Sequence, residues 1–269
     1  MVILFIICLF ILFIGFYFHN KKWDPKRAHF YPRGETIKIG HRGAPTLARE
    51  NTLESFEIAF QTGLKGIELD VQFSKDDKLV VFHDWCIKNL NGKYENIHAM
   101  DYSDILLISQ RENFHIPLLN EVLENLPEER FINIEIKSPF YLNLSLVKKV
   151  VNAIQQYNIQ KYAIVSSFNA FNVLLVKKLC PELSTAYLWS SKNSSFLFNS
   201  PLWIWICQPD GLYIDINDVN EKLINWAQRK KLSVFAFTVN NLSQLSEVKQ
   251  LKLDGIFTDD PYLKLSSSL

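Results

Sequence analysis

Residues 66–84 read GIELDVQFSKDDKLVVFHD, which is two apolar runs separated by a short polar linker. Gly66–Phe73 and Lys78–Phe82 are rich in Ile, Val, Leu and Phe, a composition that favours buried strands. The linker, residues 74–77, is too short for a crossover between parallel strands, which takes a dozen or more residues. The second run is therefore expected to return antiparallel along the first as a hairpin that ends at His83.

Outward from this hairpin, runs of strand type alternate with amphipathic runs of helix type. The other expected strands are Ile37–His41, Phe131–Lys137, Tyr162–Ser166, Thr185–Trp189, Gly211–Ile214, Ser233–Val239 and Gly255–Thr258. The expected helices are Asn51–Thr62, Leu144–Tyr157, Ala170–Leu179, Val219–Arg229 and Leu242–Leu251. Apart from the hairpin strand, eight strands remain, which predicts an α/β fold: a TIM-type (β/α)8 barrel with a hairpin extension after the second strand.

The N-terminal segment differs in composition from the rest of the 269-residue chain, whose mean hydropathy of +0.00 excludes a disordered or many-span membrane protein. Met1–Phe18 carries no charge and is apolar except for Gly15. About 17 to 25 such residues span a bilayer, so we predict one transmembrane helix, a membrane anchor over residues 1–19. A cleaved signal peptide is the alternative, but a charged start and a small-residue cleavage site are both missing.

Charge is also distributed unevenly along the chain. Residues 19–33 hold five basic side chains against Asp24 alone, a net charge of +4, whereas the rest of the chain carries −3. Residues 20–36 are therefore interpreted as a basic juxtamembrane linker, and residues 37–269 as the barrel domain. The positive-inside rule then places that domain on the cytoplasmic side of the membrane. No basic stripe indicates nucleic acid, and the four cysteines lack the spacing of a zinc site or a disulfide framework.

Reactive side chains fall at the C-terminal ends of the expected strands, which is where chemistry takes place in such barrels. Glu68 and Asp70 share one face of a strand by their spacing of two, and so do Glu135 and Lys137. With the residues at the other strand ends, the set is His41, Arg42, Glu68, Asp70, His83, Glu135 and Lys137. Three carboxylates are an oxygen cage for Mg2+ or Ca2+. Two histidines can serve as general acid and base, and two cations can neutralise a phosphodiester.

Each of these motifs alone also has a structural explanation, such as a solvated strand face, a hydrogen-bonded histidine or an ion pair. Their convergence at one end of one barrel favours catalysis. An enolase-type barrel also uses carboxylates and Mg2+, but it would spread them over three successive strands with a lysine or histidine base. A barrel that serves only as a binding module would be expected to lack a histidine or a carboxylate of the set, and none is missing.

The sequence resembles the glycerophosphodiester phosphodiesterases from Lys38 to the C-terminus. The matching runs are IGHRGAP at 39–45, ENTLESF at 50–56, GIELDVQ at 66–72, LVVFHD at 79–84, IPLLNE at 116–121, NIEIK at 133–137, SSF at 166–168 and DGIFTDDP at 254–261. The resemblance implies metal-dependent hydrolysis of glycerophosphodiesters to glycerol 3-phosphate and an alcohol such as choline or ethanolamine. Attack by water and attack by the substrate's own hydroxyl are both compatible with it.

Residue roles follow from the same resemblance, position by position. It implies His41 and His83 as the acid–base pair, Glu68, Asp70 and Glu135 as ligands of Mg2+ or Ca2+, and Arg42, Lys137, Glu50 and Phe237 as substrate contacts. Two departures concern substrate binding. Phe237 stands where the family often has tryptophan, and residues 88–92 differ from the family's usual segment after the second histidine.

A membrane anchor adds a second candidate substrate, because some anchored relatives act as lysophospholipases D. The segment Phe196–Ile206, FLFNSPLWIWI, falls between the sixth and seventh barrel strands. Trp203 and Trp205 suit a bilayer interface, so one hypothesis is that the segment enters the membrane and admits an acyl chain. The alternative is that it packs as a barrel helix or a lid. The expected partners are therefore a glycerophosphodiester or lysophospholipid substrate and the membrane lipid bilayer.

Overall fold

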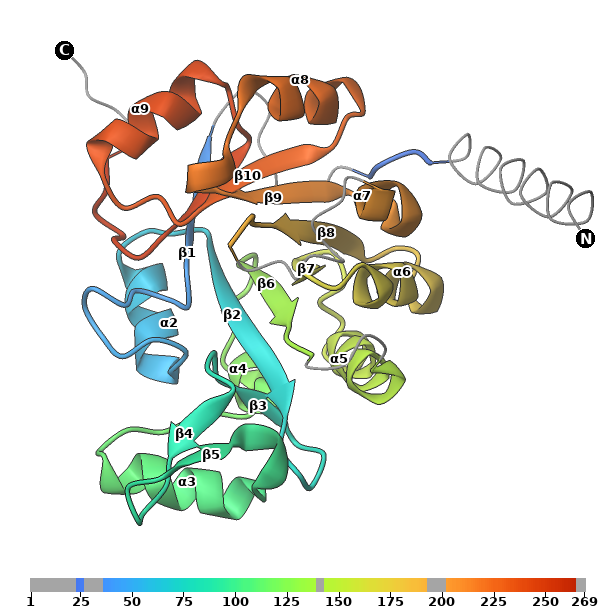
Figure 1. The fold of residues 1–269 in the computed structure, drawn as a ribbon. Helices are drawn as coiled ribbons and strands as arrows, with labels where there is room; N and C mark the ends of the chain where they lie inside the picture. Colours follow the sequence, from blue (N-terminus) through green and yellow to red (C-terminus); the bar gives the residue numbers. More distant parts are fainter. Residues whose placement is uncertain (1–22, 27–35, 139–142, 193–201, 265–269) are drawn as a thin grey trace, which may run out of the picture.

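The computed structural model describes residues 23–26, 36–138, 143–192 and 202–264 (Figure 1). In these ranges eight parallel strands form a barrel, in the order β1-β11-β10-β9-β8-β7-β6-β2, which closes because β1 also pairs with β2. The barrel strands are β1 (Ile37–Gly40), β2 (Gly66–Phe73), β6 (Phe131–Ile136), β7 (Ala163–Ser167), β8 (Ser184–Trp189), β9 (Gly211–Asp215), β10 (Ser233–Phe237) and β11 (Gly255–Thr258). The predicted TIM-type barrel is confirmed.

The hairpin predicted after the second strand is also confirmed. β3 (Leu79–Val81) pairs antiparallel with the end of β2. The linker forms a tight turn, in which the Asp77 amide donates to the Ser74 carbonyl at 3.1 Å. The Phe82 amide then donates to the Asp70 carbonyl at 3.0 Å, so the residue after Phe82, His83, is brought beside the acidic strand.

Helices cover the outside of the barrel (Figure 1). They are α2 (Leu53–Gln61), α3 (Tyr102–Arg111), α4 (Leu119–Glu124), α5 (Leu144–Gln156), α6 (Ala170–Leu179), α7 (Leu202–Cys207), α8 (Glu221–Arg229) and α9 (Leu242–Gln250), with 3-10 turns η1 (Ile97–Ala99) and η2 (Ile216–Asp218). All five expected helices are present. The sequence analysis did not predict α3, α4 or the hairpin of β4 (Cys86–Lys88) and β5 (Tyr94–Asn96). The two hairpin strands have only three residues each, too few for a periodic pattern.

The barrel interior is filled mainly by aromatic rings. Tyr213, Phe235 and Phe257 are buried with ring centroids 5.0 to 5.6 Å apart, as packed aromatic pairs prefer. Gly66 faces the Phe131 ring so closely that a Cβ there would lie 2.1 Å from it. Glycine is thus required at this position for the interior to hold its rings, and the barrel is a solid core rather than a pore.

The described part of the basic linker, residues 23–26, packs against the barrel at the N-terminal end of β9. The Trp23 indole donates to the Pro209 carbonyl at 3.1 Å, and its ring meets Trp205 edge to face at 5.6 Å. The Lys26 amide donates to Asp210 at 2.9 Å, and its ammonium group donates to the Pro181 carbonyl. The linker therefore meets the barrel at the end away from the C-terminal strand ends.

Asp210 joins three segments of the chain by hydrogen bonds at this end of the barrel, so its loss should destabilise the fold. The side chain is 3% exposed and accepts hydrogen bonds from Lys177, Lys26 and both donors of Thr185. Asp210→Ala removes the shared acceptor of these donors, although Lys177 keeps its hydrogen bond to the Gln208 carbonyl, so we expect the free energy of unfolding to fall by about 3 kcal/mol. Urea denaturation measures this, with exposed Asp24→Ala as the control. Equal midpoints for the two variants would contradict the assignment.

Two segments were predicted to contact the membrane, and the structure describes part of only one of them. The proposed anchor, residues 1–19, lies outside the described residues, and among those described no helix is long and apolar enough to cross a bilayer. Residues 202–206 belong to α7, which packs as a barrel helix, with Trp203 against Phe171 at 5.4 Å and Ile204 fully buried. The rest of the 196–206 segment lies outside the described residues.

Candidate active site

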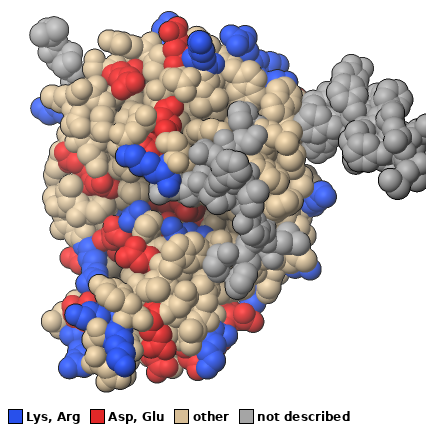
Figure 2. All heavy atoms as spheres, viewed as in Figure 1, with Lys and Arg blue, Asp and Glu red and all other residues tan. Residues whose placement is uncertain are grey.

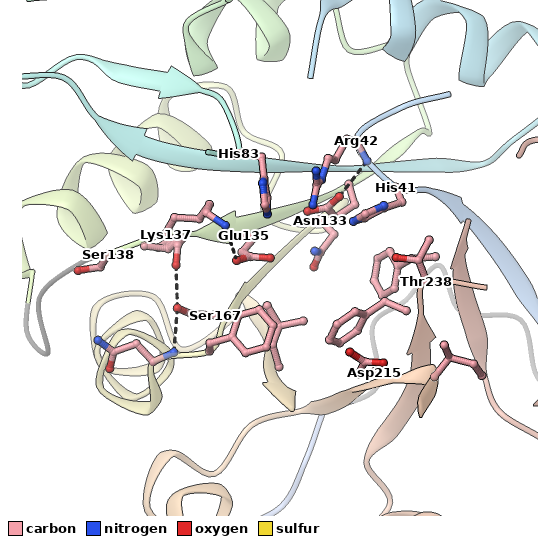
Figure 3. Close-up of a pocket in the computed structure, with 18 of the residues that line it drawn as sticks. His41, Arg42, His83, Asn133, Glu135, Lys137, Ser138, Ser167, Asp215 and Thr238 are labelled. Atoms are coloured by element: carbon pink, nitrogen blue, oxygen red, sulfur yellow. Dashed lines mark hydrogen bonds and ion pairs between the residues drawn. The ribbon is translucent and has the colours of Figure 1, made fainter. Parts of the chain in front are cut away.

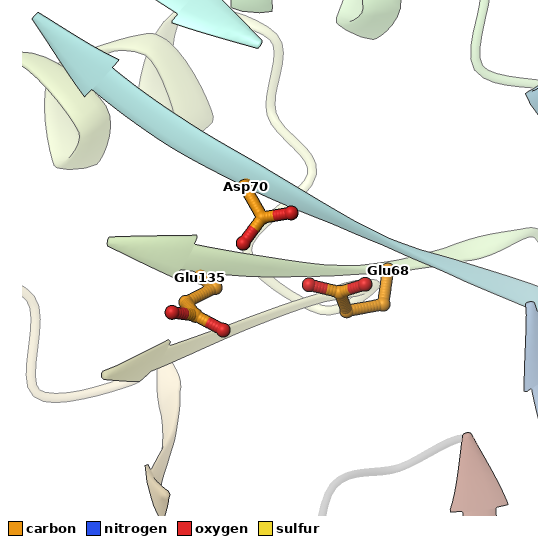
Figure 4. Close-up of side chains that lie close together, drawn as sticks. All are labelled: Glu68, Asp70 and Glu135. Atoms are coloured by element: carbon orange, nitrogen blue, oxygen red, sulfur yellow. The ribbon is translucent and has the colours of Figure 1, made fainter. Parts of the chain in front are cut away.

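Three carboxylates meet at the C-terminal ends of β2 and β6. These strands pair in parallel with Asp70 opposite Glu135, and Glu68 lies two residues before Asp70 on the same face. Figure 4 shows the three side chains pointing toward one another, and one oxygen from each lies within 4.8 Å of the others. Glu68 and Asp70 are only 4% and 1% exposed, so this is an acidic cluster enclosed by protein.

The cluster is electrostatically strained as it stands. Burial, together with the charges of Asp70 and Glu135, raises the pKa of Glu68 well above its ordinary value. Burial raises the pKa of Glu135 to about 7, although Lys137 opposes that shift. Burial would also raise the pKa of Asp70, but Lys137, Arg42 and His83 together lower it. All three carboxylates can be ionised at neutral pH only if more positive charge is present.

The residues fit a divalent cation. Asp70 Oδ1 is buried and accepts no hydrogen bond from the described residues, although Lys137 Nζ lies 3.7 Å away. A buried carboxylate oxygen without a donor is costly unless something else binds it. Oxygen ligands of this type and charge suit Mg2+ and Ca2+ alike. Glu68, Asp70 and Glu135 are therefore the residues that would hold the metal.

Two cations flank the cluster (Figure 3). Arg42 lies in the left-handed region at φ 55, which lets its amide donate to Glu68 at 2.9 Å while Nε lies 3.3 Å from Asp70. The following Gly43 is also left-handed, and a Cβ there would lie 2.3 Å from the Ser55 hydroxyl. Lys137 Nζ lies 3.8 Å from Glu135. Both cations line the same cavity, so they can neutralise an anion beside the carboxylates.

Both predicted histidines line the cavity, and each has a carboxylate partner. His41 Nδ1 lies 2.7 Å from Asp259, and His83 Nδ1 lies 2.8 Å from Asp84. A carboxylate on Nδ1 fixes the ring and leaves Nε2 for the cavity. Burial, together with the Lys137 and Arg42 charges, lowers the pKa of His83 although Asp70 opposes the shift, so His83 is neutral at pH 7.

Asp259 is held in turn by Asn240, which follows β10. The Asn240 side chain donates to Asp259 Oδ2 and accepts from the Asp259 amide at 2.9 Å. Burial would raise the pKa of Asp259, but the hydrogen bond and charge of His41 lower it, so the carboxylate is ionised. His41, Asp259 and Asn240 thus form a chain of contacts that sets the orientation of the His41 ring.

The cavity has a volume of about 890 Å³, in the range of small-molecule sites. Figure 2 shows acidic and basic side chains gathered in a hollow of this face. Its described lining is His41, Arg42, Glu68, His83, Trp85, Asn96, Asn133, Glu135, Ile136, Lys137, Ser138, Ser167, Phe168, Asn169, Leu188, Asp215, Ile216, Asn217, Phe237, Thr238, Gln244 and Phe257. Of the seven side chains predicted to meet at the strand ends, all except the buried Asp70 therefore line one cavity.

Two predicted substrate contacts lie further from the carboxylates. Glu50 is outside the described lining of the cavity and accepts two hydrogen bonds from Arg42 Nη1, at 2.9 and 3.1 Å, so it orients the guanidinium. Phe237 does line the cavity, and its ring meets Phe168 edge to face at 5.9 Å. Its side of the cavity carries aromatic rings and one charged residue of the described lining, Asp215.

Several polar residues of the site were not predicted from the sequence. Asn51, also left-handed at φ 56, donates to Asp70 Oδ2 at 2.9 Å. Asn133 lines the cavity two residues before Glu135, and its buried Oδ1 accepts no hydrogen bond from the described residues. The alternation that identified Glu135 and Lys137 also includes Asn133, and Asp259 directly follows a strand, so both carried a usable signal.

Comparison with known proteins agrees with this geometry. Residues 41–263 match the model of the Glycerophosphoryl diester phosphodiesterase family. The chain is 31% identical over 236 residues to the Glycerophosphodiester phosphodiesterase of Caldanaerobacter subterraneus subsp. tengcongensis, covering 84% of this chain and 95% of that protein. It is 35% identical over 133 residues to Lysophospholipase D GDPD1 of Homo sapiens, covering 45% of this chain and 41% of the human protein.

Among solved structures, the chain is similar to an Oleispira antarctica phosphodiesterase in complex with the product sn-glycerol-3-phosphate. The TM-score is 0.74 and the sequence identity is 26%, over 86% of this chain and 94% of that one. Fold and sequence similarity thus cover nearly the whole of the barrel.

Proposed function

Because this chain belongs to the glycerophosphoryl diester phosphodiesterase family and is an enzyme of that kind, we propose that it hydrolyses glycerophosphodiesters to glycerol 3-phosphate and an alcohol. The observation that carries the proposal is the meeting of three carboxylates, two basic side chains and two histidines at one end of the barrel, where all of them except the buried Asp70 line one cavity. This set matches the needs of phosphodiester hydrolysis: a cation site, charge neutralisation and proton transfer on both sides of phosphorus.

Glu68, Asp70 and Glu135 are proposed to hold a divalent metal ion, Mg2+ or Ca2+. When bound, such an ion supplies Lewis-acid stabilisation of the phosphoryl oxygens. Arg42 and Lys137 lie beside the same carboxylates and would bind the phosphate oxygens from either side. The charge that develops on those oxygens in the transition state is then met by groups already in place.

His83 and His41 are proposed to divide the proton transfers between them. The lowered pKa of His83 keeps its imidazole neutral, as a general base requires. Asp259 holds the His41 ring through Nδ1, which leaves Nε2 to face the cavity as the atom of a general acid. His83 would accept the proton of the attacking hydroxyl, and His41 would donate a proton to the leaving alcohol. Attack by water gives glycerol 3-phosphate directly, whereas attack by the substrate's own hydroxyl gives a cyclic phosphate that a water molecule must then open.

The direct test is turnover of glycerophosphocholine by the full chain, followed by release of choline and glycerol 3-phosphate. We expect turnover that EDTA abolishes and added Mg2+ or Ca2+ restores. Turnover that survives complete removal of metal would refute the metal-dependent mechanism. The absence of turnover on any glycerophosphodiester in the presence of both metals would refute the proposed function.

A second candidate function is lysophospholipase D activity, which the human relative's name carries for a protein matched over less than half its length. The cavity volume of about 890 Å³ favours this candidate because it could admit a lysophospholipid as well as the smaller glycerophosphodiester. Lysophosphatidylcholine assayed beside glycerophosphocholine separates the two functions. Since the metal and phosphate sites are common to both substrates, only the relative kcat/KM distinguishes them.

We further propose that residues 1–19 anchor the enzyme in a membrane, with the barrel on the cytoplasmic side. The uncharged run and the net charge of +4 that follows it support this. Extraction of membranes with alkaline carbonate tests the anchor, and protease protection of sealed vesicles tests the side. Release of the full chain by carbonate would refute the anchor.

A further inference from the structure

The side of the cavity across from the metal ligands carries one carboxylate among neutral and aromatic side chains. In the closed order of eight strands, three strands separate β9 from β2 in either direction, so the two lie on opposite sides of the barrel. Asp215 ends β9 and lines the cavity, as Figure 3 shows on the side away from His83 and Lys137. A carboxylate thus lies across the mouth of the barrel from Lys137 and the metal ligands.

No basic side chain of the described lining lies on this far side. Between β7 and the end of β11, the lining consists of Asp215 with amides, hydroxyls and apolar groups. The nearest described partners of Asp215 are neutral: Asn217 donates twice to Oδ1, at 3.0 and 2.8 Å, and Ser190 donates to Oδ2 at 3.0 Å. These contacts fix the carboxylate and occupy lone pairs but leave its negative charge uncompensated.

Aromatic rings share this part of the lining with the carboxylate, and Phe237 pairs with Asp215 in the register of β10 and β9. Phe168 follows β7 and Phe237 ends β10, the strands on either side of the β8–β9 pair. The two rings meet at 87° and are both half-buried above the aromatic interior, with Phe257 also in the lining. Ring faces beside a carboxylate are a combination that attracts organic cations.

We propose that this side of the cavity binds the quaternary ammonium group of a choline leaving group, with Asp215 as counter-charge and Phe168 and Phe237 as ring faces. The proposal rests on the proposed function and names its preferred substrate class. A quaternary ammonium group has no N–H to donate, so it needs charge and ring faces rather than free acceptors. Asp215, already hydrogen-bonded by Asn217 and Ser190, offers that charge.

The test is substrate preference, measured as the ratio of kcat/KM for glycerophosphocholine to that for the neutral glycerophosphoglycerol. Asp215→Asn keeps size and hydrogen bonding while removing the charge, so we expect this ratio to fall about tenfold. Phe168→Leu removes a ring face and should lower the ratio in the same direction. The matched control is Asp218→Asn, a neighbouring carboxylate outside the described lining, which should leave the ratio unchanged.

Equal losses on both substrates would overturn the proposal, since they would mean that Asp215 binds the common glycerol end or only supports the barrel. An unchanged ratio in Asp215→Asn would overturn it as well. If the wild-type enzyme turned over neither substrate, the proposed function itself would fail. Calorimetry with choline alone then tests the subsite directly: we expect binding to the wild type that Asp215→Asn weakens, and no binding to the wild type would refute it.

Discussion

Replacing His41 with alanine is expected to lower kcat for glycerophosphocholine by about 10³-fold, within the 10²- to 10⁴-fold typical of a lost acid or base. His41 lines the cavity, and its Nδ1 contacts the carboxylate of Asp259. The variant therefore removes the proton donor and leaves Asp259 without its histidine partner. The measurement is steady-state release of choline under saturating metal. The metal ligands are untouched, so KM should change much less than kcat.

Two further variants make the His41 result specific. Asp259→Asn keeps the shape of the partner but removes its charge, so we expect a kcat between those of the wild type and His41→Ala. His115→Ala is the control: this histidine pairs with Glu121 at 2.6 Å and lies outside the described lining of the cavity. A His41→Ala enzyme that retains more than a tenth of the wild-type kcat would contradict the role of His41.

Replacing Glu135 with glutamine is expected to weaken metal binding by about 100-fold or more. Changing a residue that only supports a metal ligand already lowers metal affinity or activity 10- to 100-fold. Glu135 is placed to be a ligand itself. Isothermal titration with Mg2+ and with Ca2+ measures the affinity without reference to turnover. Activity at low metal should fall in parallel and should recover in part at high metal.

The same measurement has a pH dependence with a definite sign. The pKa of Glu135 is raised to about 7 by burial, so below pH 7 the carboxyl is mostly protonated and must lose its proton when metal binds. Affinity should therefore fall as the pH drops from 7 to 6, by up to about tenfold for one proton. Glu135→Gln should show a weaker dependence, because Glu68, whose pKa is also raised, is then the only one of the two carboxyls left to lose a proton. A wild-type affinity that is constant over that range would contradict the placement of Glu135 as a ligand.

The carboxylate cluster was predictable because it depends only on strand periodicity and on which strands are neighbours. Glu68, Asp70 and Glu135 each follow from a period of two on strands that the sequence identifies, and the register pairs Asp70 with Glu135. The fold was predictable for a related reason: linker length alone made β3 a hairpin strand.

What the sequence did not predict depends on closure of the barrel and on exact strand ends. His41 and Asp259 are 218 positions apart and meet only because β1 pairs with β11. Asp215 was overlooked because the expected strand stopped at Ile214, one residue before its actual end. The β4–β5 hairpin is too short to have a pattern, and a small cluster of buried residues beneath it holds it in place.

The docking of Trp23 beneath β9 limits how the enzyme can stand relative to a bilayer. With an anchor that ends at residue 19, four peptide steps reach Trp23, at most about 14 Å of chain. A tether of this length would keep the N-terminal end of the barrel near the lipid headgroups, with the catalytic mouth at the other end turned toward the aqueous phase. Substrate would then arrive from solution, and a lysolipid would have to leave its leaflet to be cut. The proposed anchor would then set where the enzyme works without making the lipid surface its substrate.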